Sequence, residues 1–263
     1  MKSSLPWFLL LLSVLGACAG PAPPLPDAPV LIFGEQHDQP DHQRQVAQAV
    51  KRLAADGRLA AVVIEMAEQG RSTAGLPRDA DAASVRGALA WSGWEWPVYE
   101  GVVMSAVRAG IPVLGGNLPR ARLRETMADA SRDTLVEAPV REKLATAVRE
   151  GHCGLLPAAQ EPGMVRVQIA RDQAMAETVA GALQPARQVI LLTGAQHASR
   201  DRGVPLHLVG SGKVEAGQIH VTAFGDAAQA AGLEFDSLRD AKPSPRPDYC
   251  AGLAHKLAPK PAN

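Results

Sequence analysis

Short, continuous apolar stretches recur along the chain, and segments with helical patterning separate them. They cover residues 30–33, 60–66, 111–118, 188–193, 204–209 and 219–224. A strand that is apolar throughout is buried on both faces, as strands are in a parallel sheet covered by helices. The pattern therefore predicts an α/β domain in which helices flank a central, largely parallel (mixed) sheet.

Helices are expected between most of these strands. They are predicted at residues 41–55, 97–109, 120–132, 139–150 and 164–183, whereas residues 67–90 are polar and glycine-rich and are interpreted as an insertion. The α/β domain is then predicted to span residues 30–225. Residues 226–263 are expected to form an irregular C-terminal tail.

The N-terminal residues have the pattern of a secretion signal. Lys2 supplies a positive charge, and residues 5–15 form an apolar run that is too short to span a bilayer comfortably. The tetrapeptide LGAC at residues 15–18 resembles a bacterial lipobox, which implies a signal peptide over residues 1–17 and lipidation of Cys18. The alternative is an ordinary secretory signal with an incidental cysteine.

The residues after Cys18 favour a particular location and organisation. Ala19 stands where an aspartate would suggest retention at the inner membrane, so a lipid-anchored protein of the outer membrane is expected. Residues 18–29 are rich in proline and are predicted to be an extended tether. If Cys18 carries lipid, Cys153 and Cys250 remain as an even pair in an oxidising compartment, which predicts a disulfide, with two free buried thiols as the alternative.

Two of the predicted strands are followed by the same short motif. Residues 34–37 read GEQH and residues 194–197 read GAQH. Because ligands and chemistry collect at the carboxyl ends of parallel strands, we expect His37 and His197 to converge on one cavity, with Glu65 at the end of a neighbouring strand. The alternative is that each histidine only satisfies a carbonyl group of its own loop.

The aromatic residues are concentrated in one segment. Trp91, Trp94, Trp96 and Tyr99 lie within nine residues of each other in a chain with 4% aromatic residues. The cluster is compatible with a local core, a wall that binds a flat ring, or an oligomer interface. The 27 basic residues balance 27 acidic residues, so general binding to nucleic acid is not expected.

Several motifs together resemble a known family. They are GEQHD at 34–38, VVIEM at 62–66, WEWPVY at 94–99, GNLPR at 116–120, GHCGLLP at 151–157, QIARDQAMA at 168–176 and GAQHASRDRGVPLHL at 194–208. This set is similar to the ChaN-like haem-binding uptake lipoproteins, which are related to the Tiki, TraB and erythromycin esterase proteins. The resemblance implies haem or iron-compound binding for iron acquisition, and it is compatible with a homodimer.

The resemblance also implies roles for particular residues. Tyr99 is expected to bind the haem iron, and His37, His197, Arg120 and Arg200 are candidates to bind the propionates. The alternative function is hydrolysis, in which the two histidines act with Glu35 and Glu65 as acid–base groups or as ligands of a divalent metal ion. A purely structural or interaction role is a third alternative.

Overall fold

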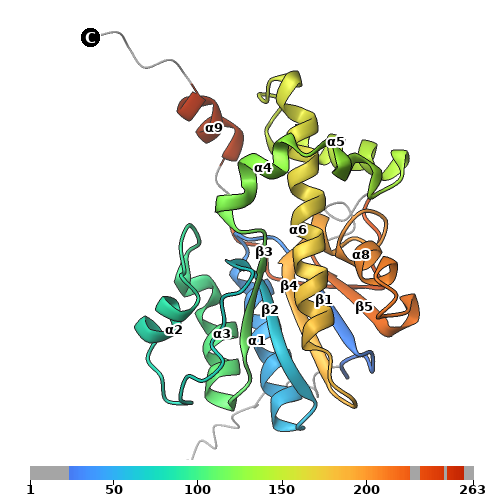
Figure 1. The fold of residues 1–263 in the computed structure, drawn as a ribbon. Helices are drawn as coiled ribbons and strands as arrows, with labels where there is room; N and C mark the ends of the chain where they lie inside the picture. Colours follow the sequence, from blue (N-terminus) through green and yellow to red (C-terminus); the bar gives the residue numbers. More distant parts are fainter. Residues whose placement is uncertain (1–23, 226–231, 246–247, 258–263) are drawn as a thin grey trace, which may run out of the picture.

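The computed structural model describes residues 24–225, 232–245 and 248–257, which form a layered α/β structure (Figure 1). The strands are β1 (Val30–Glu35), β2 (Leu59–Glu68), β3 (Val113–Asn117), β4 (Gln188–Gly194), β5 (Ile219–Phe224) and β6 (Ser237–Arg239). They form a sheet in the order β3-β2-β4-β1-β5-β6, and every neighbouring pair is parallel. The predicted fold class is confirmed, with a wholly parallel sheet in the described residues.

The helices cover both faces of this sheet. They are α1 (Pro40–Ala55), α2 (Ala82–Ala88), α3 (Trp96–Ala109), α4 (Leu123–Ala128), α5 (Ala138–Gly151), α6 (Glu161–Ala182), α7 (Ala195–Ala198), α8 (Val204–Gly210) and α9 (Tyr249–Leu257). Alternate residues of β1 show the two layers, because Leu31 and Phe33 pack with α1 and α3, whereas Val30 and Ile32 pack with α6 and α8. None of the described helices is long and apolar enough to cross a membrane.

The helix α6 extends beyond the sheet on which it packs. Its C-terminal part packs on the sheet through Met175 and Val179, and its N-terminal part rises beyond the carboxyl ends of the strands, beside α4 and α5 (Figure 1). A separate apolar cluster joins α5 to α6, and it is formed by Leu144 and Val148 of α5 with Val165 and Ile169 of α6. The helices thus build a wall around the carboxyl edge of the sheet.

Residues 204–209 were expected to be a strand, and this expectation is wrong. They form α8, with Pro205 in its first turn, where a proline is favourable because no backbone N–H is needed there. Val204 and Leu208 are one helical turn apart and are both buried in the layer that contains α6. Residues 120–132 also differ from the single expected helix, because short 3₁₀ turns flank α4.

The segments on either side of the predicted domain are more ordered than expected. The C-terminal residues contribute β6 and α9, although a wholly irregular tail was expected. In the predicted tether, Asp27 pairs with Arg58, and Gln188 donates hydrogen bonds to backbone carbonyl groups of Pro26 and Ala28. The predicted signal peptide and Cys18 lie outside the described residues.

Candidate functional site

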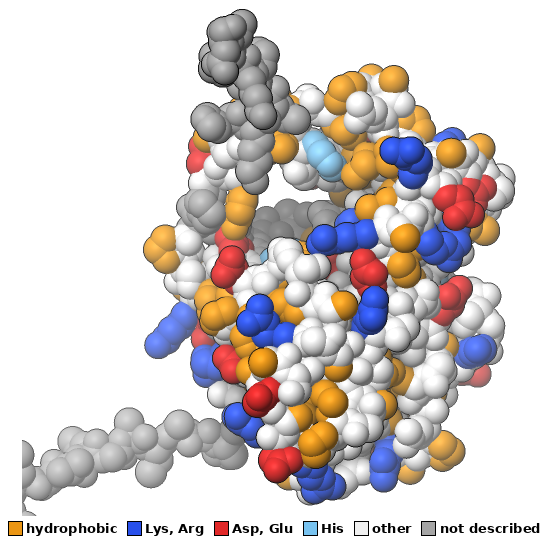
Figure 2. Space-filling view, turned by 60° about the vertical axis from the view of Figure 1, so that its left-hand side comes forward, with side chains coloured by type: hydrophobic (Ala, Val, Ile, Leu, Met, Phe, Trp, Pro, Cys, Tyr) orange, Lys and Arg blue, Asp and Glu red, His pale blue; other side chains and the backbone are white. Residues whose placement is uncertain are grey.

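A cavity of about 1100 Å³ lies at the carboxyl edge of the sheet, where the parallel strands end and the helical wall begins. The molecule is visibly hollowed in the upper half of the view in Figure 2. The lining of the cavity includes both predicted histidines and three buried carboxyl groups, those of Glu35, Glu65 and Asp172. This position is the one that topology predicts for a ligand site in an α/β sheet.

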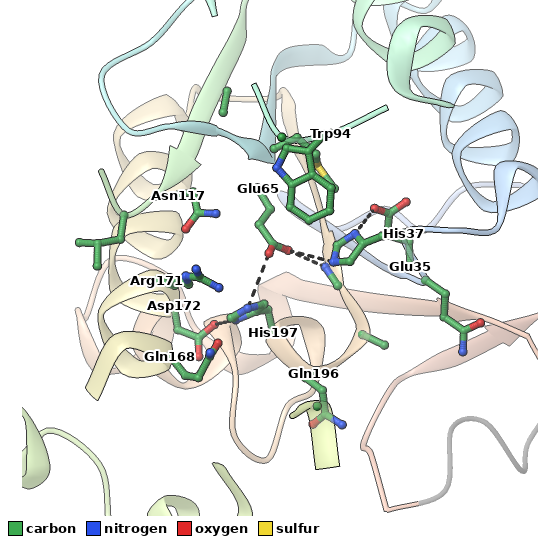
Figure 3. Close-up of a pocket in the computed structure, with 18 of the residues that line it drawn as sticks. Glu35, His37, Glu65, Trp94, Asn117, Gln168, Arg171, Asp172, Gln196 and His197 are labelled. Atoms are coloured by element: carbon green, nitrogen blue, oxygen red, sulfur yellow. Dashed lines mark hydrogen bonds and ion pairs between the residues drawn. The ribbon is translucent and has the colours of Figure 1, made fainter. Parts of the chain in front are cut away.

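Glu65 lies between the two histidines (Figure 3). Its Oε2 atom is 4.0 Å from Nε2 of His37, and its Oε1 atom is 3.8 Å from Nε2 of His197. The hydroxyl of Thr193 and the backbone N–H of Gly194 both donate hydrogen bonds to Oε2, at 2.7 and 2.8 Å. The structure therefore brings together the residues that the paired Gly-x-x-His motifs predict to converge.

The glycines of the two motifs permit this close approach. A Cβ atom at Gly194 would lie 3.0 Å from Nε2 of His37, and one at Gly34 would lie 2.8 Å from the Cβ atom of Ala198. Larger residues at either position would push the imidazoles or α7 away from the edge of the sheet. The absence of side chains at Gly34 and Gly194 therefore leaves room for the imidazole of His37 and for α7 at the carboxyl edge of the sheet.

Each imidazole is oriented by its own carboxylate. Nδ1 of His37 is 2.8 Å from Oε1 of Glu35, and Nδ1 of His197 is 2.7 Å from Oδ1 of Asp172. Because Nδ1 is engaged in both rings, both Nε2 atoms face Glu65. Asp172 is not among the sequence-predicted site residues, although its three- and four-residue spacing from Gln168 and Met175 places it on the side of α6 that faces the site.

Burial and pairing shift the pKa values of these groups. Burial disfavours the charge on His37, but the hydrogen bond to Glu35 and the charge of Glu65 outweigh it and raise the pKa of His37 to about 9. Burial would also raise the pKa of Glu65, but the charges of His197 and His37 lower it to about 2. At neutral pH, His37 therefore carries a proton and Glu65 is ionised.

The pair of His197 and Asp172 is more deeply buried. Burial opposes the charge on His197, but the charges of Asp172 and Glu65 raise the pKa of the imidazole above its ordinary value, while Arg171 acts in the opposite direction. Burial raises the pKa of Asp172 as well. The two groups are therefore coupled to each other in a buried environment.

Tyr99, the expected iron ligand, lines the cavity, but its hydroxyl is engaged by neighbouring side chains. Its side chain is 1% exposed, and its hydroxyl donates a hydrogen bond to Oε1 of Glu35 at 2.8 Å and lies 3.2 Å from Nδ1 of His37. Burial and the charge of Glu35 hold the pKa of Tyr99 far above its usual range. The structure thus places Tyr99 beneath the histidine, where it supports the hydrogen-bond network.

The aromatic cluster has two parts. Trp91 packs edge-on against Trp96 at 4.9 Å between ring centroids, and both belong to the apolar layer that contains Tyr99. Trp94 lines the cavity, with its ring 4.6 Å from the imidazole of His37 (Figure 3). The cluster is therefore partly a local core and partly a wall of the cavity.

The two arginines that were expected at the site are placed differently. Arg120 is exposed and lines the cavity. Arg200 does not line it, because its guanidinium pairs with Asp236 at 2.6 Å and donates to the backbone carbonyl groups of Ile219 and Ala216. The structure removes Arg200 from the candidate site and makes it a support for β5.

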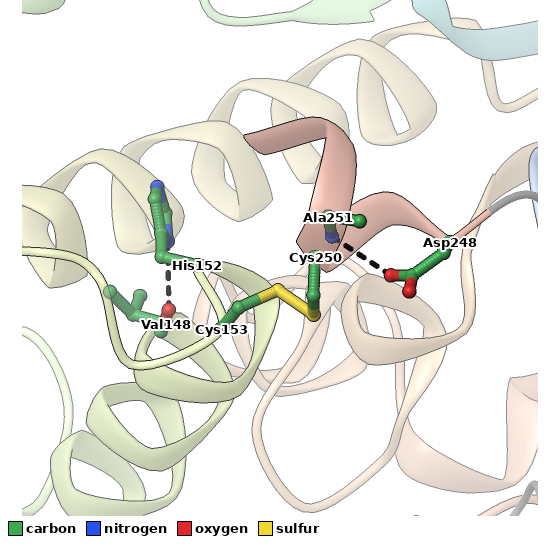
Figure 4. The surroundings of a disulfide bond; sticks show 6 residues. All are labelled: Val148, His152, Cys153, Asp248, Cys250 and Ala251. Atoms are coloured by element: carbon green, nitrogen blue, oxygen red, sulfur yellow. Dashed lines mark hydrogen bonds between the residues drawn. A yellow bond between two sulfur atoms is a disulfide. The ribbon is translucent and has the colours of Figure 1, made fainter. Parts of the chain in front are cut away.

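A disulfide holds the C-terminal helix beside the cavity (Figure 4). It joins Cys153, which follows α5, to Cys250 in the first turn of α9, so the predicted pairing is present. Tyr249 precedes Cys250 directly, lines the cavity and is 57% exposed. Sequence reasoning set Tyr249 aside as part of a tail, although its position next to the predicted disulfide was the signal that it is held near the domain.

The carboxylates and imidazoles fit a metal ion poorly as they stand. Among the described residues, no group of three or more histidine, cysteine, aspartate or glutamate side chains is arranged to hold one. The nitrogen–oxygen distances around Glu65 are those of ion pairs. The arrangement is better suited to proton transfer or to binding a polar group of a ligand.

Comparison with known proteins agrees with this fold. A structure of ChaN of Campylobacter jejuni with cofacial haem binding superposes with a TM-score of 0.62 at 24% identity, over 76% of this chain and 82% of that chain. An erythromycin esterase aligns over 75% of this chain and 70% of its own at 12% identity, with a TM-score of 0.41. No curated protein gives a significant match. Residues 22–208 match the family described as haem-binding uptake, Tiki superfamily, ChaN, and the chain therefore belongs to that family.

Proposed function

We propose that the protein binds haem in the cavity at the carboxyl edge of the sheet. The observation that carries the proposal is the family match over residues 22–208, together with a cavity at the expected edge of the fold. At about 1100 Å³, the cavity is slightly larger than the usual range of about 300–1000 Å³ for ligand pockets. It offers an aromatic wall at Trp94 for an apolar ring and polar groups for the carboxylates of haem.

Tyr249 is the residue we assign to the haem iron. A phenolate oxygen is a hard anionic donor that suits ferric iron, and tyrosine ligates haem iron in some proteins. Both tyrosines line the cavity, but Tyr99 is buried and its hydroxyl donates a hydrogen bond to Glu35, whereas Tyr249 is exposed. His37 is a weaker candidate for iron because its pKa of about 9 keeps it protonated at neutral pH. A protonated imidazole instead suits the role of hydrogen-bond donor to an anionic group.

We further propose that the protein acts in iron acquisition from the outer membrane. The LGAC motif that ends at Cys18 supports a lipid anchor, and residue 19 supports the outer membrane. The cofacial binding named for the Campylobacter jejuni structure supports a homodimer in which two copies enclose their haems. Measuring the molar mass of the protein with and without haem tests this dimer, and a monomer in both states would contradict it.

A matched pair of variants tests the iron ligand. Tyr249→Phe should shift the visible spectrum of the ferric haem complex and weaken binding, because it deletes the donor oxygen and keeps the ring. Tyr99→Phe should leave the spectrum as it is, because that hydroxyl is occupied by Glu35. A spectrum that changes in Tyr99→Phe and stays unchanged in Tyr249→Phe would overturn the assignment.

A second function, hydrolysis, is favoured by one specific observation. Each histidine has a carboxylate on Nδ1 and presents Nε2 to the same buried Glu65. Such carboxylate–imidazole pairs are suited to general acid–base catalysis. If the site hydrolyses esters, His197→Gln should abolish turnover of a simple aryl ester while haem binding persists. Turnover that is absent from the wild-type chain, or unchanged in His197→Gln, would remove this candidate.

A further inference from the structure

Arg171 is a charged side chain that the rest of the site leaves without a partner. It projects from α6 and lines the cavity, and its Nε atom is buried without a hydrogen bond. Within the part of the chain that the structure describes, its guanidinium makes no ion pair. An arginine carries five N–H donors and no acceptor, so only an acceptor group can satisfy it.

The neighbouring carboxylates do not supply that acceptor. Glu65 is bound by Thr193 and Gly194 and faces the two histidines, and Asp172 points its Oδ1 atom at His197. The guanidinium is nevertheless close enough to His197 for its charge to act on that imidazole. Arg171 is therefore held in a buried polar region without being neutralised by direct contact.

Asn117 gives an independent sign of an absent group at the same place. It ends β3 and lines the cavity, and its Oδ1 atom is buried with no hydrogen-bond partner among the described residues. Figure 3 shows its amide next to the guanidinium of Arg171, on the side of the cavity away from Trp94. Buried polar groups are usually hydrogen-bonded, so an unpaired guanidinium and an unpaired amide that line the same cavity indicate a ligand position. The unpaired atom of Asn117 is an acceptor, and a half-turn of its amide presents the N–H₂ group in place of the oxygen.

We propose that Arg171 and Asn117 form an anion-binding pole that takes a carboxylate group of the ligand. A guanidinium binds a carboxylate through two parallel hydrogen bonds, and the amide of Asn117 adds a third donor once it has turned to present its nitrogen. The inference rests on haem as the ligand and deepens that proposal, because it assigns a propionate to this pole.

The pole also fixes how an amphipathic ligand lies in the cavity. Trp94 and His37 stand on one side of the cavity, and Arg171 and Asn117 stand on the other (Figure 3). A flat apolar ring with carboxylates along one edge is bound best with its ring near Trp94 and its anionic edge toward Arg171. Arg120 is exposed, so water screens its attraction for the same group.

The test compares haem with its dimethyl ester, which has the same ring and lacks the negative charges. For the wild-type chain, esterification should weaken binding by about tenfold or more, as expected when a charge-assisted hydrogen bond is lost. In Arg171→Gln, haem and its ester should bind with affinities within about twofold of each other, because the partner of the carboxylate has gone. Arg171→Lys keeps the positive charge but cannot form two parallel hydrogen bonds with one carboxylate. Its ratio of haem affinity to ester affinity should therefore lie between those of the wild type and Arg171→Gln.

Arg120→Gln is the matched control, since it removes an exposed guanidinium from the same cavity. It should keep the wild-type ratio between haem and ester. The proposal is overturned if Arg171→Gln keeps the full effect of esterification, or if Arg120→Gln abolishes it.

The same variants separate this inference from the proposal that haem is bound at all. If the wild-type chain does not bind haem, the proposed function fails, and the pole is then tested on the ligand-free protein with succinate as a simple dicarboxylate. A rise in melting temperature that is present in the wild-type chain and absent in Arg171→Gln supports the pole for a free carboxylate. No rise in the wild-type chain overturns it.

Discussion

The hydroxyl of Tyr99 donates a hydrogen bond to Glu35 across 2.8 Å, inside the apolar layer beneath the cavity. Glu35 in turn holds Nδ1 of His37 at the same distance, so the tyrosine supports the histidine through the carboxylate. This relationship makes Tyr99 part of the framework of the site. Tyr249 also lines the cavity, and its side chain is 57% exposed, so a ligand in the cavity can approach it.

Tyr99→Phe should therefore destabilise the protein. The substitution removes one donor from a fully buried carboxylate and leaves the packing almost unchanged, so the free energy of unfolding should fall by about 1–3 kcal/mol. Urea denaturation followed by circular dichroism measures this change. Tyr249→Phe is the control and should alter the stability by less than about 0.5 kcal/mol, because its side chain is exposed. Equal stabilities for Tyr99→Phe and the wild type would contradict the supporting role.

Glu65→Gln should lower stability in a pH-dependent manner. Burial raises the pKa of Glu65, but the charges of His197 and His37 outweigh it and bring the pKa to about 2, below the ordinary 4.5. A carboxyl group whose pKa falls on folding stabilises the protein above its unfolded pKa, and this contribution is lost as the pH falls toward the folded value. At neutral pH we expect a loss of about 3 kcal/mol in the variant.

The difference between Glu65→Gln and the wild type should shrink as the pH falls from 4.5 toward 2. Denaturant titrations at several pH values follow it, and Glu95→Gln, at an exposed position on the cavity, serves as the control. A difference that stays constant over this range would show that Glu65 is not stabilised as an anion by the two histidines.

The disulfide should be required for the iron site. Replacing Cys153 and Cys250 by serine removes the covalent link that holds α9 and Tyr249 at the cavity. We expect the haem spectrum of the double variant to resemble that of Tyr249→Phe. In the chain-entropy model a loop with a separation of 97 residues contributes about 4–5 kcal/mol, and measured values are often smaller. A double variant with a wild-type haem spectrum would show that α9 is held by other contacts.

Cys18→Ala should release the protein from the membrane fraction or leave it as an unprocessed precursor. The lipobox resemblance assigns lipid attachment to the thiol of Cys18, which alanine lacks. Metabolic labelling with a radioactive fatty acid, followed by fractionation, measures the effect. Normal labelling of the variant would rule out this anchor.

Much of the fold could be predicted because its strands are apolar along their whole length. β1, β2 and β4 are buried on both faces, and this leaves a continuous signal in the sequence. β6 is short and partly polar, so it has no such signal, and it depends on pairing with β5. Residues 204–209 were predicted to be a strand because most of them are apolar. The four-residue spacing of Val204 and Leu208, which is typical of a helix, was given less weight.

The convergence of the histidines could also be predicted, whereas the role of each aromatic residue could not. Two strands with the same motif at the same end must place His37 and His197 at one edge of a parallel sheet. The role of Tyr99 depends on its position on the buried stripe of α3, together with Trp96 and Val103. The helical spacing of these three residues was present in the sequence. Tyr99 was nevertheless assigned to the haem iron, because a phenolate oxygen is a suitable ligand of ferric iron.

An absorbance titration of the full-length chain with ferric haem, in mild detergent, tests the central claim most directly. We expect a saturable change in the Soret band that ends at one haem per chain, and a weaker, spectrally different complex in Tyr249→Phe. A spectrum that grows in proportion to added haem, with no saturation and no difference between the two proteins, would contradict the account.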